Sequence, residues 1–474
     1  MSWVLVYLLI GWLIRVGMVP VVLRRDFAPG AAMAWLGIVF LHPYIGAILF
    51  AFVGEARLGT ARVSRHREMV NHFRSRAWTV GALPESGADR AYLPLERQAR
   101  KIGSMPPLAG NSIEFILECP TLVDKLVADI AGARSTVDLL YYIFACDDSG
   151  RRVVRALTEA AGRGVRCRVL VDAVASRGFF RGKGLAKPLR EAGIEVREAL
   201  PVALLRRGLP RMDLRNHRKL AIIDGQIAFA GSHNLIDADY HGRRGGPWVD
   251  LTGRFTGPIV GEFAVVFAED WSFESGQLAD DPAAIAGEFP PGDLTMQIVP
   301  TGPTAPGETY RRLLLGAIQC AQSQLILTTP YFVPDEPTLV ALQMAADRGV
   351  KLSLIVPQRP DHMFTAAAGR AHFARLMESG IAIFLYQSGL IHAKTVTVDD
   401  KLVLFGSANL DVRSFNLNFE LSSLLFGPEV TDRLRAIQNG YLADSHRLDP
   451  KEWASRSPIK TYADRAISLL SPLL

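Results

Sequence analysis

Two distant segments of the chain repeat the same six residues at the same spacing. The first copy consists of His217, Lys219, Asp224, Gly231, Ser232 and Asn234, and the second of His392, Lys394, Asp399, Gly406, Ser407 and Asn409. Each copy combines an imidazole that can attack phosphorus or carry a proton with a fixed cation and small polar donors. This set predicts phosphoryl chemistry that uses no metal and no other cofactor.

Each motif is expected to lie on a β-hairpin. The lysine and the aspartate are separated by short apolar or β-branched runs, at residues 220–223 and 395–398. Residues two apart in a strand project from the same face, so the histidine and lysine of each copy should point to one side. A two-residue turn would pair Ile223 with Gln226 and set each histidine opposite the serine of its own motif. A register shifted by one residue is the alternative.

The duplication extends upstream of the motifs. Segments 161–171 and 346–356 resemble each other, as do 189–194 and 376–381, and each alternates helical with strand-like patterns. The chain is therefore expected to contain two similar α/β halves that each supply half of one active site on a pseudo-twofold axis. The expected divisions are two transmembrane helices in 1–55, a juxtamembrane linker in 56–110, and the two halves in 111–290 and 291–474, the second ending in a helix.

The paired motifs resemble those of the phospholipase D superfamily. Over its full length the chain resembles the bacterial cardiolipin synthases with two such motifs. The likeness rests on two apolar N-terminal segments, on 141–144, 215–219, 329–334, 406–415 and 471–474, and on Asn418 with Glu420. One departure is Ser232, where relatives often have a second glycine, although this serine matches the second motif. The resemblance implies two phospholipase D-like α/β halves behind an N-terminal transmembrane hairpin.

A phosphodiester needs cations on its nonbridging oxygens, a good nucleophile and a proton donor. Lys219 and Lys394 are expected to supply the charge. One neutral histidine would attack phosphorus to form a phosphohistidine, and the other, protonated, would release the alcohol and then activate the next one. The resemblance implies that His217 is the nucleophile and His392 the general acid and base. The symmetry of the sequence leaves the reverse open.

The other candidate residues of the site have supporting roles. The amides and hydroxyls of the motifs are expected to bind the substrate phosphate; they are Ser232, Asn234, Ser407 and Asn409. Asp224 and Asp399 belong to the catalytic motifs, but their strand parity favours orienting the hairpin over direct chemistry. Asp250 and Glu420 follow the two motifs in comparable places. Their carboxylates are expected to hold the Nδ1 hydrogen of a motif histidine.

The resemblance implies transfer of a phosphatidyl group from one phosphatidylglycerol to another, which gives cardiolipin and glycerol. Phosphatidylglycerol and anionic membrane lipids are the expected partners, with no nucleic acid, and with a homo-oligomer left open. A hydrolytic phospholipase D, another phosphatidyltransferase or a nuclease would use the same residues. A catalytically silent membrane scaffold is disfavoured because no catalytic position is lost in either motif.

The N-terminus favours a membrane partner over nucleic acid, between which the net charge of +6 does not discriminate. Residues 3–23 and 31–53 are apolar except for Arg15 and His42, and each is long enough to cross a bilayer as a helix. Arginines follow the second segment, at 57, 62, 65, 67, 74 and 76. We therefore expect a multi-pass protein of the bacterial inner membrane with its catalytic halves on the cytoplasmic side.

Two further features carry less weight. The basic and apolar stretch 204–211 is either a solvated loop or a surface that dips into lipid headgroups beside the site. The four cysteines are scattered without metal-binding spacing, so small buried thiols in a reducing compartment are expected.

Overall fold

The computed structural model describes residues 2–25, 27, 29–54, 60–77, 90–201, 214–239, 246–280, 292–304, 308–469 and 471. It divides into two compact units, an N-terminal unit of residues 1–63 with 202–214, and a larger unit of 64–201 with 215–474. The basic stretch 204–211, residues 56–59 and 78–89 of the expected linker, and residues 472–474 lie outside the described residues.

Three apolar helices make up most of the described part of the N-terminal unit: α1 (Trp3–Leu23), α2 (Pro29–Leu41) and α3 (Pro43–Val53). Within the described ranges, only α1 is long and apolar enough to cross a membrane. The prediction of one continuous second span over 31–53 is therefore wrong. Pro43 has no amide hydrogen and disfavours a helical residue before it, and His42 accordingly leaves the helical region at φ −133° and ψ 79°.

Two polar side chains of this apolar unit donate to backbone carbonyls. The guanidinium Nε of Arg15 donates to the carbonyl oxygen of Phe40 at 2.9 Å, close to the point where α2 ends. The Tyr44 hydroxyl donates to the carbonyl of Tyr7, on whose ring it stacks. A charge in an apolar segment needs such a partner, so Arg15 fits this helix without reaching water.

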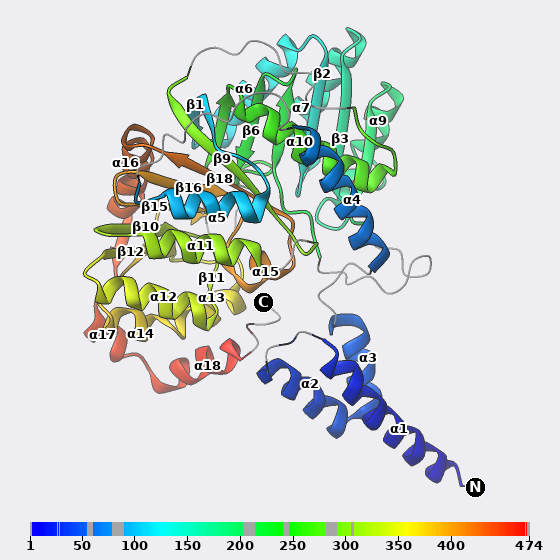
Figure 1. Cartoon of the computed structure of the whole chain (residues 1–474), viewed down its shortest axis with the longest axis vertical. Coiled ribbons are helices and arrows are strands. Elements are labelled where there is room, and N and C mark those ends of the chain that lie inside the picture. The colour runs from blue at the N-terminus through cyan, green and yellow to red at the C-terminus, as the bar shows by residue number, and fades with distance from the viewer. Residues whose placement is uncertain are drawn as a thin grey trace. The chain divides into compact units, whose positions relative to one another are not determined.

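In the larger unit, fifteen strands of the described residues form one sheet, in the order β19-β13-β12-β10-β15-β16-β18-β9-β1-β8-β6-β5-β2-β3-β4 (Figure 1). The strands of the first half are β1 (Leu108–Ile116), β2 (Thr136–Tyr141), β3 (Arg166–Asp172), β4 (Glu195–Ala199), β5 (Leu220–Ile223), β6 (Ile227–Gly231) and β8 (Thr252–Thr256). Those of the second half are β9 (Leu294–Thr301), β10 (Gln324–Thr328), β12 (Lys351–Pro357), β13 (Ala382–Tyr386), β15 (Thr395–Val398), β16 (Leu402–Gly406), β18 (Glu420–Phe426) and β19 (Ser445–Arg447).

The strand order is the same in both halves when each is followed inward from its parallel strands. These are β4-β3-β2 and β13-β12-β10, antiparallel strands continue inward from each, and in the second half β19 adds an antiparallel strand at the outer edge. The two halves join where β1 pairs with β9 in the antiparallel direction. This arrangement confirms the predicted α/β fold of two similar halves and adds that both share one sheet.

Helices cover both faces of the sheet, because its strands are apolar on both sides. The first half has α6 (Cys119–Gly132), α7 (Asp148–Gly162), α8 (Arg177–Phe180), α9 (Ala186–Glu191) and α10 (Ile259–Ser275). The second half has α11 (Thr309–Cys320), α12 (Glu336–Asp347), α13 (Met363–Arg370), α14 (Phe373–Glu378), α15 (Val412–Asn416), α16 (Pro428–Ala443), α17 (Pro450–Ala454) and α18 (Pro458–Ser468). In both halves one long helix, α10 or α16, packs on the face opposite to the others.

Two helices precede the repeated halves. They are α4 (Thr60–Ala77) and α5 (Leu93–Gly103). Arg74 of α4 forms a buried ion pair with Glu269 of α10 and also donates to the Gly103 carbonyl. Arg67 donates to the carbonyl of Thr304. Some of the arginines that follow the apolar segments therefore hold α4 on the larger unit.

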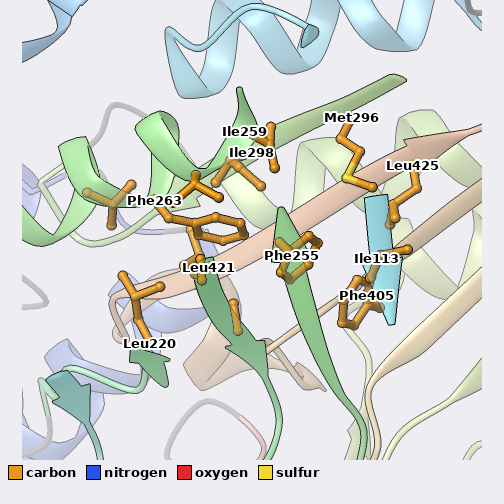
Figure 2. Close-up of a cluster of buried hydrophobic side chains, with 14 of the residues drawn as sticks. Ile113, Leu220, Phe255, Ile259, Phe263, Met296, Ile298, Phe405, Leu421 and Leu425 are labelled. Atoms are coloured by element: carbon orange, nitrogen blue, oxygen red, sulfur yellow. The ribbon is translucent and has the colours of Figure 1, made fainter. Parts of the chain in front are cut away.

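A shared apolar core fastens the two halves together. Figure 2 shows side chains of β1, β8 and α10 meeting side chains of β9, β16 and β18 in one cluster. Phe255 of the first half stacks on Phe405 of the second, with ring centroids 6.0 Å apart. Because this core is continuous, the histidines and lysines that precede β5 and β15 are held in a fixed relation to each other.

The two motif hairpins form as expected, but their register differs from the prediction. Ile223 pairs with Ile227, and Val398 pairs with Leu402, so each loop has three residues instead of two. The first loop residue, Asp224 or Asp399, adopts a positive φ of 51° or 52°. This left-handed residue adds one position to the turn, so the alternative register is the correct one.

Candidate active site

His217 of the first half is positioned by the second half. Its amide donates to the carbonyl of Phe419 at 2.9 Å, next to an isolated bridge between Asn216 and Phe419. Its ring Nδ1 lies 3.0 Å from both carboxylate oxygens of Glu420. The ring of Tyr142 packs against the imidazole in an edge contact, with centroids 4.8 Å apart. These contacts leave Nε2 as the ring nitrogen available for chemistry.

His392 of the second half is positioned by the first half in the same way. It follows β14 (Leu390–Ile391), which pairs with β7 (Trp248–Val249), and its amide donates to the carbonyl of Val249 at 2.7 Å. Its Nδ1 lies 2.6 Å from Asp250 Oδ1. The ring of Trp248 lies over the imidazole, with centroids 4.3 Å apart.

Each motif histidine is therefore bonded to the carboxylate that follows the motif of the other half. This crossed pairing requires both histidines to lie at the seam between the halves. A carboxylate at Nδ1 fixes the tautomer and the orientation of the ring and raises the basicity of Nε2. The sequence indicated that Asp250 and Glu420 follow the motifs, but it did not indicate which histidine each one holds.

The motif serines bind these carboxylates. Ser407 Oγ donates to Glu420 Oε2 and Ser232 Oγ donates to Asp250 Oδ1, both at 2.5 Å. In turn each hydroxyl accepts a backbone N–H, from Leu421 at 3.0 Å and Leu251 at 2.9 Å. The hydroxyl protons are thus directed at the carboxylates that hold the histidines.

The two motif asparagines have different partners. Asn234 Oδ1 accepts the amide hydrogen of Ile143 at 3.1 Å, one residue after Tyr142. Asn409 Nδ2 donates to Asp411 Oδ2 at 3.2 Å. Among the described residues, the buried Asn409 Oδ1 has no hydrogen-bond partner. Each asparagine comes two residues after a serine that bonds to a carboxylate of the site, so both amides remain candidates for contact with a substrate phosphate.

The two lysines are buried beside the histidines. Lys219 Nζ donates to the His217 carbonyl, and Lys394 Nζ donates to the His392 carbonyl, each at 2.6 Å. The Lys219 ammonium also lies 5.1 Å from the centroid of the Tyr142 ring. Each lysine lowers the pKa of both histidines, so the four basic groups share one electrostatic site.

Burial dominates the protonation of this site. It lowers the pKa of His217 and of His392 to about 4, against the opposing effect of Glu420 and Asp250. Burial also lowers the pKa of Lys394 to about 8 and that of Lys219 well below its usual value. The pKa of Asp250 and of Glu420 falls because the basic groups around them outweigh the effect of burial. An anion bound among these groups would raise the pKa of all four bases.

Asp224 and Asp399 lie at the far ends of β5 and β15 from the lysines. Asp224 accepts the backbone N–H groups of Arg134, Ser135 and Thr136 at 2.8 to 2.9 Å. Asp399 accepts the corresponding groups after α11 and also the Tyr92 hydroxyl at 2.6 Å. These carboxylates tie each hairpin loop to the turn before the neighbouring strand, and they bond to neither histidine.

The motif glycines are required by close strand packing. A side chain at Gly406 would place its Cβ 2.1 Å from the Leu421 carbonyl oxygen, and one at Gly231 would place it 2.3 Å from that of Leu251. In both copies the leucine that the glycine approaches directly follows the carboxylate residue of the site, Glu420 or Asp250. The glycine therefore sets how closely Glu420 or Asp250 approaches the motif.

Several groups in the site carried no assigned role in the sequence. Tyr142 and Trp248 pack on the two imidazoles, and Ser414 Oγ and Asn418 Nδ2 donate to Glu420 Oε1 at 3.0 and 3.2 Å. Arg218, which has no counterpart in the second motif, donates to the Glu420 and Thr301 carbonyls and pairs with Asp270. Tyr142, Arg218, Ser414 and Asn418 lie in segments that carry the family resemblance, whereas the signal for Trp248 was its place two residues before Asp250. Within the described ranges, no cluster of metal-binding side chains was found.

The chain matches the model of a protein family described as "Cardiolipin synthase, PLD-like domain" at residues 126–244 and 314–440, which contain the two motifs. It is similar to cardiolipin synthase A of Edwardsiella ictaluri (strain 93-146), with 36% identity over 471 residues, 98% of this chain and 97% of that protein. It is equally similar to cardiolipin synthase A of Erwinia tasmaniensis, with 36% identity over 486 residues, 100% of this chain and 99% of that protein.

Among solved structures, the chain is similar in fold to phosphatidylserine synthase from Haemophilus influenzae Rd KW20. The TM-score is 0.61 at 15% sequence identity, and the match covers 80% of this chain and 99% of the other.

Proposed function

The chain belongs to the cardiolipin synthase family of phospholipase D-like proteins, and from this premise we propose how its two motifs carry out phosphatidyl transfer. The chain is a phosphatidyltransferase that joins two phosphatidylglycerol molecules into cardiolipin and releases glycerol. The observation that carries the mechanism is the crossed pairing, in which His217 is held by Glu420 and His392 by Asp250. It supports a single centre with two oriented imidazoles.

In the first step, His217 Nε2 attacks the phosphorus of one phosphatidylglycerol. The bond from phosphorus to the glycerol oxygen breaks, and His392 gives its proton to that oxygen. In the second step, His392 takes the proton from a hydroxyl of the second phosphatidylglycerol, whose oxygen attacks phosphorus and breaks the bond to His217. Two displacements conserve the phosphodiester, so the reaction needs no nucleotide.

The carboxylate contacts favour His392 as the acid. Asp250 Oδ1 accepts two hydrogen bonds, one from the Nδ1–H of His392 at 2.6 Å and one from the Ser232 hydroxyl. Glu420 accepts hydrogen bonds from four groups: the His217 ring, two serine hydroxyls and the Asn418 amide. The carboxylate with fewer competing donors stabilises a protonated imidazole more strongly. His217 must be neutral to attack phosphorus. Its partner Glu420 has more competing donors and therefore stabilises the protonated form of His217 less.

Lys219 and Lys394 act as the cations for the nonbridging oxygens. Their burial makes the interaction stronger than it would be in water. The phosphodiester anion offsets their mutual repulsion and raises the pKa of the nearby imidazoles, so substrate binding protonates the acid. Asn234 and Asn409 complete the phosphate site. We assign Ser232 and Ser407 to holding Asp250 and Glu420.

The transfer reaction takes place at a membrane. We propose that α1 spans the bacterial cell membrane and that the catalytic halves, 111–290 and 291–474, lie on its cytoplasmic side. The apolar character of α1 and the arginines of α4 support this orientation. Confinement to the bilayer raises the effective concentration of the second lipid, which favours transfer over hydrolysis.

The test is mass spectrometry of the lipid products that purified enzyme makes from phosphatidylglycerol vesicles. Cardiolipin and glycerol in equal amounts are expected. Phosphatidic acid as the main product would instead identify a hydrolytic phospholipase D. No lipid product, with an unchanged lipid composition in cells carrying His217→Ala, would favour a silent scaffold.

A further inference from the structure

Helix α18 and its C-cap residue expose an apolar stripe in the second half. Ile459 and Tyr462 of α18 are 79% and 70% exposed, and Leu469, the C-cap residue that keeps the helical conformation, is 81% exposed. At about 100° per residue these positions fall within one quarter of the helix circumference, so they form one continuous line. Large apolar side chains aligned in this way are unusual on a surface that faces only water.

The acidic and basic side chains of α18 lie on different sides of the helix. Its carboxylate, Asp464, lies opposite the apolar stripe and is buried in ion pairs with Arg370 at 2.9 Å and Arg456 at 2.6 Å. The exposed charged side chains of α18 are Lys460 and Arg465, both cationic. An apolar stripe flanked by cations, with the acid turned inward, matches the surface of a bilayer that contains anionic lipids.

Helix α13 exposes further large apolar side chains next to α18. It packs on α18, and the Arg370–Asp464 ion pair joins the two helices. Met363 and Phe364, at the start of α13, are 70% and 62% exposed. Figure 1 labels both helices in the C-terminal half, with α18 following α17. We use the term α13–α18 surface for Met363, Phe364, Ile459, Tyr462 and Leu469.

The α13 end of this surface lies next to a residue that acts on the active site. Asp361, two residues before Met363, accepts the Tyr331 hydroxyl at 2.7 Å. The charge of Asp361 acts on Lys394 and raises its pKa against the effect of burial. Only two or three residues therefore separate Asp361, whose charge acts on the catalytic lysine, from the exposed side chains of Met363 and Phe364.

We propose that the α13–α18 surface inserts into the headgroup and acyl boundary of an anionic bilayer and holds the mouth of the active site at the depth of the lipid phosphodiesters. Lys460 and Arg465 contact lipid phosphates while the apolar stripe enters the acyl region. The proposal rests on the proposed function only in taking membrane phospholipids as substrates. It adds a second attachment, distinct from α1, that presents lipids to the site.

The direct test measures the depth of single labels in the full-length protein. Cys146 and Cys320, which are partly exposed, are replaced by serine, and an environment-sensitive fluorophore is attached at Met363→Cys or Tyr462→Cys. The matched control is Met344→Cys on α12, a methionine that is 55% exposed in the same half. In phosphatidylglycerol vesicles, nitroxides on the acyl chains should quench the first two labels at least threefold more than the control.

Equal quenching at all three positions would overturn the proposal. A blue-shifted emission without quenching by lipid nitroxides would also overturn it, because protein, from a second copy or another part of the chain, would then cover the surface. Neither readout depends on catalysis, so a failure of the proposed function would not be mistaken for a failure of this inference.

The functional test uses Phe364→Glu and Ile459→Glu, with Met344→Glu as the control. Cardiolipin formation from vesicles should fall at least tenfold in the first two variants and stay within twofold of wild type in the control. Activity on short-chain phosphatidylglycerol, dissolved as monomers, should stay within twofold in all three variants. Equal losses on both substrates would place these residues in folding or catalysis and contradict the proposal.

Discussion

His392 Nδ1 lies 2.6 Å from the carboxylate of Asp250, although 142 residues separate them in the chain and they belong to opposite halves of the repeat. The symmetric contact joins His217 to Glu420. Each half therefore supplies the carboxylate that holds the histidine of the other half, and neither half alone contains a complete histidine–carboxylate pair.

Asp250→Asn should lower the rate of cardiolipin formation roughly 10²- to 10⁴-fold with little change in KM, because the amide no longer fixes the His392 tautomer or stabilises its protonated form. Turnover on phosphatidylglycerol vesicles measures the effect. Asp237→Asn is the control, since Asp237 is a carboxylate of the same half that bonds to Ser149 and to no imidazole. Equal losses in the two variants would contradict the assigned role.

Gly406→Ala should abolish most activity and lower the thermal unfolding midpoint, because the new Cβ would lie 2.1 Å from the Leu421 carbonyl oxygen. The strands would separate beside Glu420 and loosen its bond to His217. Gly440→Ala on α16 is the control, because a Cβ there meets no atom within 4 Å and alanine favours a helix. Differential scanning fluorimetry and a turnover assay distinguish the two.

Asp399→Asn should act on stability more than on catalysis. The carboxylate accepts three backbone amides and the Tyr92 hydroxyl, and an amide leaves some of these donors unpaired. The expected cost is about 1–3 kcal/mol, seen as an unfolding midpoint lower by a few °C. Turnover per folded molecule should remain within about threefold of wild type. A loss of 100-fold at unchanged stability would show that Asp399 takes part in the chemistry, and Asp400→Asn, at the exposed neighbouring residue, is the control.

Stability should fall as the pH decreases from about 6.5 to about 4. Burial lowers the pKa of His217 and His392 from 6.5 to about 4 in the folded chain. Between these values the unfolded chain binds more protons than the folded one, so acidification favours unfolding. The double variant His217→Gln/His392→Gln should show a shallower fall of the unfolding midpoint than wild type. His446→Gln, at an exposed histidine of β19, should retain the wild-type slope, and identical slopes in all three proteins would contradict the burial argument.

The sequence was sufficient for the features that depend on local pattern. The duplicated motifs predicted two similar halves, and the apolar runs after Lys219 and Lys394 predicted the strands β5 and β15. Both follow from periodicity and from repeated spacing, which a single chain displays directly.

The remaining features depend on contacts between distant residues. The hairpin register was predicted one residue off because the left-handed conformation of Asp224 and Asp399 is stabilised by amides about 90 and 76 residues earlier in the chain. The choice of carboxylate partner for each histidine is set by the seam between the halves. The uniformly apolar composition of 31–53 predicts one continuous helix, whereas the single residue Pro43 ends α2 and starts a new helix after His42.

The most direct test of the central account traps the phosphatidyl group on the enzyme. In His392→Ala, a phosphatidyl ester of p-nitrophenol needs no acid for its leaving group, and the second step lacks its base. One equivalent of p-nitrophenolate should appear per active site, with a phosphatidyl adduct located on His217 by mass spectrometry under alkaline conditions. An adduct on His392 in His217→Ala, or full turnover without any adduct in either variant, would contradict the account.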